Sequence, residues 1–390
     1  MSLKLAWYGD DFTGSTDVLE AVSLAGLEAV LFLRQPDAAL LARFRHCQAI
    51  GLAGDSRSQS PAWMDEHLPG VFSWMKSLGA GKAHYKVCST FDSSPSTGSI
   101  GRAMELGQRA FGTSSTLVLA GAPALGRYVI FGHLFARSGD RVYRIDRHPV
   151  MSRHPVTPMR ESDLALHLAE QTSAARFEIL DGYDEASMRE AGARIDAGPA
   201  FVVGSSGVEH ALTLHWGLER RERRPGSAVD RLIVLSGSCS GVTARQIEHA
   251  LQQGYAGVSL LTDADPANAA VAAWEAGRSV VLYSSKDESD RQPLDDAGRQ
   301  ALAARRGEVL DEVLKRTGAR RVVIAGGDTS SHAVPRLGLR ALEFIGSLAP
   351  GAPLCRAAAD DPARDGLEIV CKGGQCGGDG FFEEVRRGGL

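Results

Sequence analysis

Leu3-Lys4-Leu5-Ala6-Trp7-Tyr8-Gly9-Asp10-Asp11-Phe12-Thr13-Gly14-Ser15-Thr16-Asp17 is the stretch that decides the fold. Its apolar first part, up to Tyr8, is typical of a buried β-strand. The residues that follow repeat their apolar positions at helical spacing until Gly26, which ends the helix. A strand, a short polar turn and a helix therefore open the chain, and Asp17 is interpreted as a first-turn residue that favours the helix dipole.

The same alternation continues along the chain. A further helix is expected to begin at Pro61, with Ser60 as its N-cap. Strands that alternate with helices predict a mostly parallel sheet. The other early buried strands are expected at 29–33, 84–87, 116–120 and 200–203.

A charged segment, 219–227, ends in Pro and Gly and interrupts this rhythm, so we expect a domain boundary there. Strands are expected again at 232–235 and near Val258, Val280 and Val322, with a helix from Thr243. We therefore predict an α/β protein of two domains, 1–225 and 226–390, each a mostly parallel sheet flanked by helices.

The composition of the 390 residues excludes several classes of protein. The formal charge is only -4, which argues against a dedicated nucleic-acid or membrane-surface protein. No apolar run approaches the roughly 20 residues that span a bilayer, and no signal peptide is evident, so a cytoplasmic protein is expected. The six cysteines are scattered and are expected to be free thiols.

The first polar motif is the pair Asp10 and Asp11, which follows the first strand. The carboxyl ends of parallel strands border the ligand crevice of such a sheet. Two adjacent carboxylates could orient sugar hydroxyls, act as a general base or help to hold Mg²⁺, and the alternative is a turn with capping side chains.

A second motif runs from Lys86 through Ser89 and Thr90 to a helix start near Ser99. A lysine, hydroxyls and a helix N-terminus suit a carboxylate or phosphate, although a polar loop with a capping serine explains them equally well. Arg127 is interpreted as following a strand end, where it could bind a carboxylate in bidentate fashion. His133 is either a ligand-binding or a structural histidine.

Three motifs of the second half are rich in small residues. Ser236-Gly237-Ser238-Cys239-Ser240 follows a strand, and Thr243 with Gln246 is expected to form a capping box at the next helix. Gly326, Gly327, Asp328 and Thr329 form a plausible phosphate cradle. The run Lys372-Gly373-Gly374 is typical of a backbone that passes close to a ligand, and a flexible turn is the alternative.

Taken in order, these motifs resemble the four-carbon acid sugar kinase family, over most of the chain. The resemblance implies an N-terminal sugar-acid domain and a C-terminal nucleotide domain. It places Asp10, Asp11 and Lys86 at the sugar-acid site, and Ser238, the Gly326–Thr329 loop and Gly374 at ATP. Family members often read Lys-x-Asp-Ser-Thr-x-Arg-Gly where this chain has Cys88 for the aspartate and a Ser or Asp at the arginine position, which alters the expected specificity.

We therefore predict ATP-dependent phosphorylation of a small sugar acid such as threonate, erythronate or 3-oxo-tetronate. Mg²⁺ would neutralise charge on the phosphates, with its protein ligands unassigned. Asp11 or Asp10 would be the catalytic carboxylate, and Lys86, Ser89, Thr90, Arg127 and His133 would bind the acid.

The partner is a small molecule rather than a nucleic acid or a membrane, and a homodimer is left open. One alternative is a non-catalytic sugar-acid sensor of the same fold. Another is a nicotinamide-dependent oxidoreductase, which the absence of a Gly-x-Gly-x-x-Gly motif after the first strand disfavours. A P-loop motif is absent as well.

Overall fold

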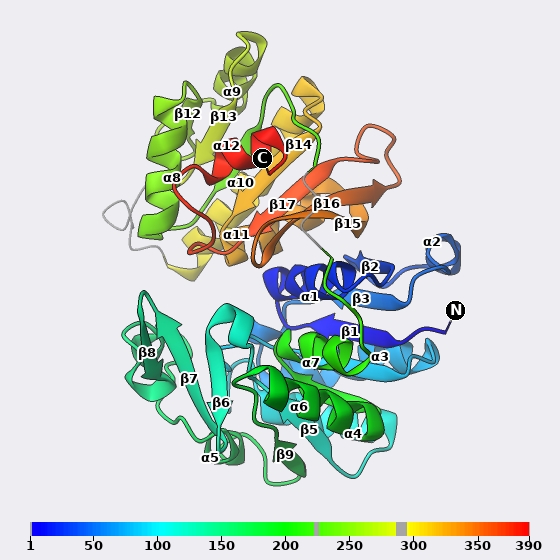
Figure 1. Ribbon diagram of the computed structural model, residues 1–390. Coiled ribbons are helices and arrows are strands. Elements are labelled where there is room, and N and C mark those ends of the chain that lie inside the picture. Colours follow the sequence, from blue (N-terminus) through cyan, green and yellow to red (C-terminus); the bar gives the residue numbers. More distant parts are fainter. Residues whose placement is uncertain (1, 222–225, 286–294, 390) are drawn as a thin grey trace. The chain divides into compact units, whose positions relative to one another are not determined.

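The computed structural model describes residues 2–221, 226–285 and 295–389 (Figure 1). The chain divides into an N-terminal unit, which ends at Arg221, and a C-terminal unit, which takes the rest of the chain together with Phe32–Arg34. The predicted boundary at 225 falls within residues 222–225, which lie outside the described residues. The α/β class is confirmed, and each unit is described below by itself.

The N-terminal unit is built on a sheet with the strand order β2-β3-β1-β4-β10-β5-β9. All pairings from β3 to β9 are parallel, as predicted. The strands of this sheet are β1 (Leu5–Gly9), β2 (Ala29–Phe32), β3 (Ala49–Ala53), β4 (Lys82–Lys86), β5 (Thr116–Leu119), β9 (Phe177–Ile179) and β10 (Phe201–Gly204). The helices are α1 (Phe12–Leu24), α2 (Ala38–Arg43), α3 (Pro61–Ser77), α4 (Ile100–Phe111), α5 (Leu164–Ala169), α6 (Glu185–Ala197) and α7 (Gly207–His215).

The core of this unit surrounds the central strands, because every residue of β1 and β4 is buried. Such continuous burial is expected of a parallel sheet that helices cover on both faces. Trp7 and Tyr85 are among the largest fully buried side chains. The predicted N-cap of α3 is confirmed, since the Ser60 side chain accepts a hydrogen bond from the Trp63 backbone.

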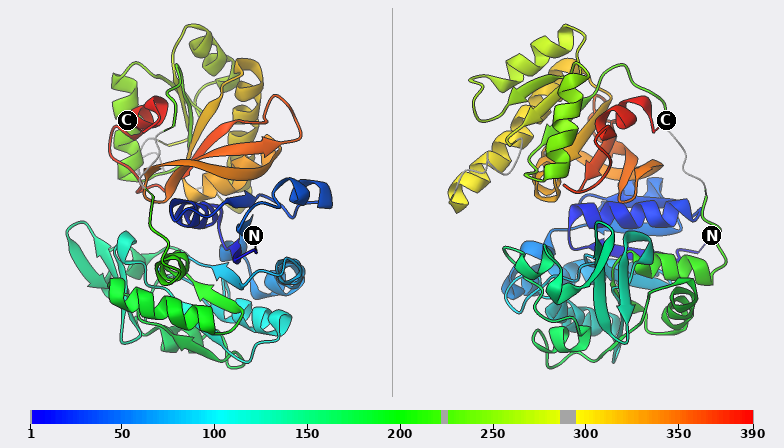
Figure 2. Two further views of the ribbon diagram at one scale, coloured as in Figure 1. Left: turned by 45° about the vertical axis from the view of Figure 1, so that its right-hand side comes forward. Right: turned by 60° about the vertical axis from the view of Figure 1, so that its left-hand side comes forward.

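A small antiparallel sheet, which the sequence did not predict, also belongs to the N-terminal unit. Its strands β6 (Arg127–Ile130), β7 (His133–Ser138) and β8 (Arg141–Arg144) pair in the order β6-β7-β8. Figure 2 shows it as a layer separate from the parallel sheet of the same unit. Arg127 therefore begins a strand, and a short helical turn, Pro123–Leu125, separates it from the end of β5.

The C-terminal unit has the strand order β12-β13-β11-β14-β17-β16-β15. The pairings from β12 to β17 are parallel, whereas β16 pairs antiparallel with both β17 and β15. Its strands are β11 (Ile233–Ser236), β12 (Ala256–Ser259), β13 (Val280–Tyr283), β14 (Arg321–Ala325), β15 (Leu339–Ala349), β16 (Ala352–Ala359) and β17 (Glu368–Lys372). Its helices are α8 (Gly241–Gln252), α9 (Pro266–Glu275), α10 (Asp296–Thr317), α11 (Gly327–Ala333) and α12 (Phe381–Arg387).

The core of the C-terminal unit lies between its sheet and the helices α8 and α12. Buried strand residues such as Val234, Val323 and Val370 belong to one cluster with Ile247 of α8 and Phe382 of α12. None of the six cysteines, all of which lie in the described ranges, forms a disulfide, as predicted. Across the described ranges of the chain, no helix is long and apolar enough to cross a membrane.

Candidate active site

The first candidate site lies at the carboxyl ends of three neighbouring strands of the N-terminal unit. In the sheet register Gly9, the last residue of β1, stands beside Ala53 of β3 and Lys86 of β4. In the strand order β2-β3-β1-β4, strands β2 and β3 lie on one side of β1 and β4 lies on the other. The direction in which strands are added to the sheet therefore changes at β1. Ligand crevices of parallel sheets open at such switch points.

The two aspartates after β1 play different structural parts. Asp11 is the N-cap of α1, because its Oδ1 accepts a hydrogen bond from the Gly14 backbone. Its Oδ2 is bound at 2.8 Å by Arg57. Asp10 is buried, with 5% exposure, and its Oδ1 has no hydrogen-bond partner among the described residues. The capping interpretation thus holds for Asp11, while Asp10 keeps an uncommitted oxygen.

The electrostatic surroundings separate the two carboxylates further. Burial, reinforced by the neighbouring charge of Asp11, raises the pKa of Asp10 to about 7. Burial would also raise the pKa of Asp11, but Arg57 and Lys86 outweigh it and lower that pKa. At neutral pH Asp11 is therefore ionised, whereas Asp10 is poised between its two protonation states.

Arg57, which the sequence analysis did not select, links the aspartates to the Lys86 motif. One guanidinium nitrogen binds Asp11, and the other donates at 2.9 Å to both carboxylate oxygens of Asp92. The side chain of Asp92 is fully buried. It also accepts hydrogen bonds from Thr90 and Thr157, so the carboxylate is well satisfied.

Lys86 is buried at the end of β4 and its amine faces three carboxylates. The nearest is Asp17, at 3.9 Å from the amine nitrogen. Burial opposes the charge of Lys86, but Asp17, Asp11 and Asp10 outweigh this and raise its pKa. The prediction that Asp17 is a first-turn residue is wrong, because α1 begins at Phe12 and Asp17 falls in its second turn. Its role is to pair with Lys86.

A glycine makes room for this lysine. A side-chain carbon on Gly14 would lie 2.8 Å from the Lys86 amine and 2.7 Å from Asp11 Oδ1. Contacts below about 3 Å are not tolerated between such atoms, so any larger residue would displace the lysine or the cap. Gly14 therefore allows the helix to approach the end of β4 closely.

The remaining predicted residues of this unit lie in the loop after β4 and at the starts of the strands β6 and β7. Thr90 donates to Asp92 and to the Cys88 sulfur, while Ser89 is half-buried in the same turn. Arg127 donates to the backbone carbonyls of Leu125 and Gly126. His133 begins β7 and its Nδ1 lies 3.1 Å from Ser162 Oγ, which indicates a structural contact.

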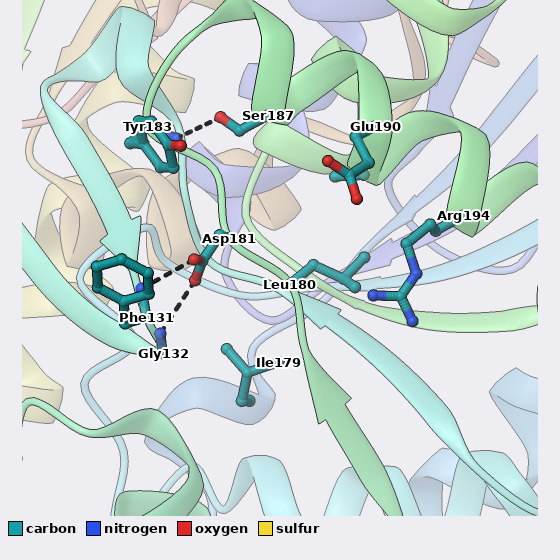
Figure 3. Close-up of a pocket in the computed structure, with 10 residues that line it drawn as sticks. Phe131, Gly132, Ile179, Leu180, Asp181, Tyr183, Ser187, Glu190 and Arg194 are labelled. Atoms are coloured by element: carbon teal, nitrogen blue, oxygen red, sulfur yellow. Dashed lines mark hydrogen bonds between the residues drawn. The ribbon is translucent and has the colours of Figure 1, made fainter.

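A pocket of about 390 Å³ lies elsewhere in the N-terminal unit, after β9 (Figure 3). None of its lining residues was predicted as a site residue. Asp181 is committed there, because its two oxygens accept the backbone N–H groups of Phe131 and Gly132. Arg194 is likewise paired with Glu178. Asp181 thus holds the β6–β7 turn, and we assign the pocket no part in the activity.

The second candidate site is the carboxyl edge of the sheet in the C-terminal unit. β11, β14 and β17 are adjacent and parallel, and Ala325 stands in register with both Ser236 and Lys372. The loops after these strands carry Ser238, Gly326 and Gly374, respectively. The sheet thus gathers three predicted nucleotide-binding motifs at one edge.

Glycines allow these loops to pack closely. Gly326 has a φ of 120°, which favours glycine over any other residue. A side-chain carbon on Gly374 would lie 2.6 Å from Ser238 Oγ, and one on Gly326 would lie 2.8 Å from Thr329 Oγ1. Gly327, Asp328 and Thr329 form the first turn of α11, where Asp328 is exposed and Thr329 is buried.

The prediction of a capping box by Thr243 and Gln246 is wrong. The N-cap of α8 is Ser240, whose side chain accepts from the Val242 backbone, so the helix begins earlier than expected. Thr243 instead donates at 2.8 Å to the Gly374 carbonyl. Gln246 donates to the carbonyls of Cys376 and Gly378, each at 2.9 Å. Both side chains therefore hold the last glycine-rich loop against α8.

Two further polar groups lie at this edge. The Lys372 amine donates at 3.2 Å to Thr243 Oγ1, and burial lowers its pKa to about 8. The hydroxyl of Ser236 is buried without a partner in the described part of the chain. No group of three or more His, Cys, Asp or Glu residues that could hold a metal ion occurs within residues 2–221, 226–285 and 295–389.

Comparison with known proteins assigns both units to one family. Residues 5–204 match a family model described as a sugar-binding N-terminal domain, and residues 233–382 match one described as a nucleotide-binding C-terminal domain. The chain belongs to the four-carbon acid sugar kinase family. It is therefore a sugar-acid kinase with a nucleotide-binding domain.

Relatives of this kinase match it along its whole length. A 3-oxo-isoapionate kinase of Paraburkholderia graminis is 42% identical, over 100% of this chain and 95% of its own. A 3-oxo-tetronate kinase of Methylobacterium radiotolerans is 30% identical, over 98% of each chain. A solved structure from Salmonella typhimurium LT2 shares the fold, with a TM-score of 0.80, 22% identity and 99% coverage of both chains.

Proposed function

We propose that this kinase transfers the γ-phosphoryl group of ATP to a hydroxyl of a small sugar acid of the 3-oxo-isoapionate or 3-oxo-tetronate kind. The proposal draws its substrate class from the relatives with these activities, of which the 3-oxo-isoapionate kinase is 42% identical. The N-terminal unit would bind the acid and the C-terminal unit the nucleotide, in keeping with the two family models.

The observation that carries the chemistry is the buried, uncommitted oxygen of Asp10. A general base works best when its pKa is near the operating pH, and the pKa of Asp10 is raised to about 7. Asp11 is a poorer base because both of its oxygens are engaged, by Gly14 and by Arg57. We therefore assign the acceptance of the hydroxyl proton to Asp10.

Asp11 and Lys86 would then supply the fixed charges of this site. Asp11 stays ionised beside Arg57 and adds to the burial that raises the pKa of Asp10, because a second negative charge nearby disfavours ionisation. The Lys86 amine would stabilise the negative charge that develops on the attacking oxygen as Asp10 takes its proton. Positioning and electrostatics of this kind dominate phosphoryl transfer.

The loops of the C-terminal unit fit a nucleotide. Phosphates are commonly bound by backbone N–H groups in glycine-containing loops, and Gly326 and Gly374 leave no room for a larger side chain against Thr329 and Ser238 at this edge. The partnerless Ser236 hydroxyl adds a hydrogen-bonding group. ATP would supply the phosphoryl group, while Mg²⁺, which needs only one or two protein carboxylates beside the phosphates, would find one in the exposed Asp328.

The proposal is tested by a coupled ADP-release assay on a panel of acids. The panel contains 3-oxo-isoapionate, 3-oxo-tetronate, D-threonate and D-erythronate, each with and without Mg²⁺. We expect one of the 3-oxo acids to give the highest kcat/KM and turnover to require the metal. Turnover of none of the four acids above the background ATPase rate would refute the proposed substrate class.

A further inference from the structure

The side chain of Arg306, in α10, lies against the loop that follows β11. A side-chain carbon on Gly237, the first residue after β11, would lie 2.8 Å from Arg306 Cζ and 2.9 Å from its Nε. The same carbon would lie 2.3 Å from Thr329 Oγ1. The guanidinium and the Thr329 hydroxyl therefore meet at Gly237, one residue before Ser238, at the carboxyl edge of the C-terminal sheet.

A serine fixes the guanidinium in this position. Arg306 Nε and Nη2 both donate to Ser284 Oγ, at 2.9 and 2.6 Å, respectively. Ser284 follows β13, and its backbone N–H donates to the Ser236 carbonyl at 3.1 Å, which ties it to the end of β11. The guanidinium is therefore oriented by the protein itself, as expected of a preorganised binding group.

One part of this guanidinium remains available. Nη1 of Arg306 makes no hydrogen bond within the described ranges and is not fully buried, and the residue as a whole is half-buried. No carboxylate among the described residues forms an ion pair with it. Burial lowers the pKa of Arg306, and interactions with Cys239 and Asp328 only partly oppose this shift. A partly buried cation without an ionic partner is costly, and a bound anion would relieve that cost.

A second cation near these loops is not available in the same way. Lys372 is fully buried, and its amine donates to the Thr243 hydroxyl. The loops themselves offer backbone N–H groups, which carry no net charge, whereas the phosphates of a nucleotide carry several negative charges. Arg306 can supply a positive charge at the same edge, because its free nitrogen is not enclosed.

We propose that Arg306 binds the phosphate chain of the nucleotide. The inference rests on the proposed function and adds to it a charged side chain from α10. The guanidinium suits this part because its donors match the geometry of phosphate oxygens and its charge is permanent. Ser284, which holds the opposite edge of the group, is then a positioning residue. Binding of ATP and ADP should depend on Arg306, whereas binding of adenosine should not.

The test separates the phosphates from the rest of the nucleotide on variants of the full-length chain. KM for ATP is measured at saturating sugar acid and Mg²⁺, together with the inhibition constants of ADP and adenosine as competitors of ATP. We expect Arg306→Gln to raise KM for ATP and the inhibition constant of ADP about tenfold, because a charge-assisted hydrogen bond is lost. The inhibition constant of adenosine should stay within about twofold, since adenosine carries no phosphate. Arg306→Lys keeps the charge but not the planar fork, so it should show the same selective loss to a smaller extent.

Two further variants distinguish a phosphate contact from a purely structural role. Ser284→Ala removes the anchor and leaves the charge, so KM for ATP should rise by less than about threefold. Arg305→Gln is the matched control, because Arg305 is the exposed neighbour on α10, and it should change none of the constants.

An unchanged KM for ATP on Arg306→Gln would overturn the inference. An equal loss of ADP and adenosine binding would do the same, as would an effect of Ser284→Ala as large as that of Arg306→Gln. These outcomes are distinct from failure of the proposed function, in which the unmodified kinase itself turns over no acid of the panel.

Discussion

The two units of this kinase share one architecture and use its carboxyl edge in opposite ways. In the N-terminal unit, the edge is lined by paired charged side chains, such as the half-buried Asp11 with Arg57 and the buried Asp92 with the same arginine. In the C-terminal unit, the edge is formed by glycine and serine loops, in which Gly326 and Gly374 leave no room for larger side chains. Charged side chains at fixed positions can recognise the individual polar groups of a small substrate. Backbone N–H groups are well suited to bind phosphates, because phosphate groups are the same in every nucleotide.

This comparison implies that activity should be most sensitive to changes of charge at the edge of the N-terminal unit. At the edge of the C-terminal unit, in its glycine loops, it should be most sensitive to changes of side-chain volume. The largest effect is expected for Asp10→Asn, which is nearly isosteric but cannot accept a proton. We expect kcat to fall by about 10²- to 10⁴-fold, the usual contribution of a general base. Near-normal turnover by this variant would exclude Asp10 as the base and leave Asp11 as the candidate.

The pH dependence of activity in the unmodified kinase is an independent test of the role of Asp10. Since Asp10 must be deprotonated to act, kcat/KM should fall as the pH decreases through about 7, and Asp10→Asn should lack this limb. Its folded-state pKa lies above the unfolded value, so the stabilising contribution of Asp10 is present at low pH and is lost as the pH rises through about 7. Thermal unfolding at pH 8 should therefore show Asp10→Asn to be at least as stable as the unmodified chain.

An intermediate effect is expected at the glycine edge. Gly326→Ala forces a non-glycine residue into a φ of 120° and places its side chain against Thr329. KM for ATP should rise about tenfold or more, because a strain of about 1–3 kcal/mol disfavours the loop conformation that binds. Calorimetric affinity for the sugar acid should stay the same.

Gly373→Ala is the control for this loop variant, since a side-chain carbon there would meet no atom within 4 Å. It should leave KM for ATP near its original value. If Gly326→Ala weakened sugar-acid binding and spared ATP, the assignment of the two ligands to the two units would be reversed.

The smallest effect is expected for Cys88→Asp, which adds a negative charge at the carboxyl edge of the N-terminal sheet. A carboxylate at this position would compete with an anionic substrate for the cations Arg57 and Lys86 of this edge, so KM for the acid should rise about 3- to 10-fold. Cys88→Ser keeps a neutral acceptor for the Thr90 hydroxyl and should alter KM by less than about twofold. A lower KM for the acid in Cys88→Asp would contradict an anion-binding site beside Cys88.

The sequence allowed the strands and the polar motifs to be predicted because both depend on local patterns. Apolar runs such as 116–120 are strands, and Ser60 caps its helix through a residue only three positions away. The family resemblance rested on motifs of the same local kind, and it was confirmed. Each motif follows a strand, and parallel pairing brings the motifs of one unit together.

The parts that could not be predicted depend on contacts between distant residues. Arg57 lies 46 positions from Asp11 in the sequence, although the buried run 49–53 before it was a usable signal of a strand end. Thr243 and Gln246 have the spacing of a capping box, but they bind carbonyls about 130 residues away. The antiparallel strands β6–β8 are short and partly exposed, so they lack the continuous apolar runs of the parallel strands.

The position of β17 in its sheet has a consequence for the order in which the C-terminal unit can assemble during synthesis. β17 is the last of the strands of this unit to be translated, yet it lies between β14 and β16. Until the ribosome has released residues 368–372, the β15–β16 hairpin has no link to the parallel strands of its own unit. Strand edges left open in this way are prone to wrong pairing. Until β17 has been synthesised, the β15–β16 hairpin must therefore avoid pairing with other strands.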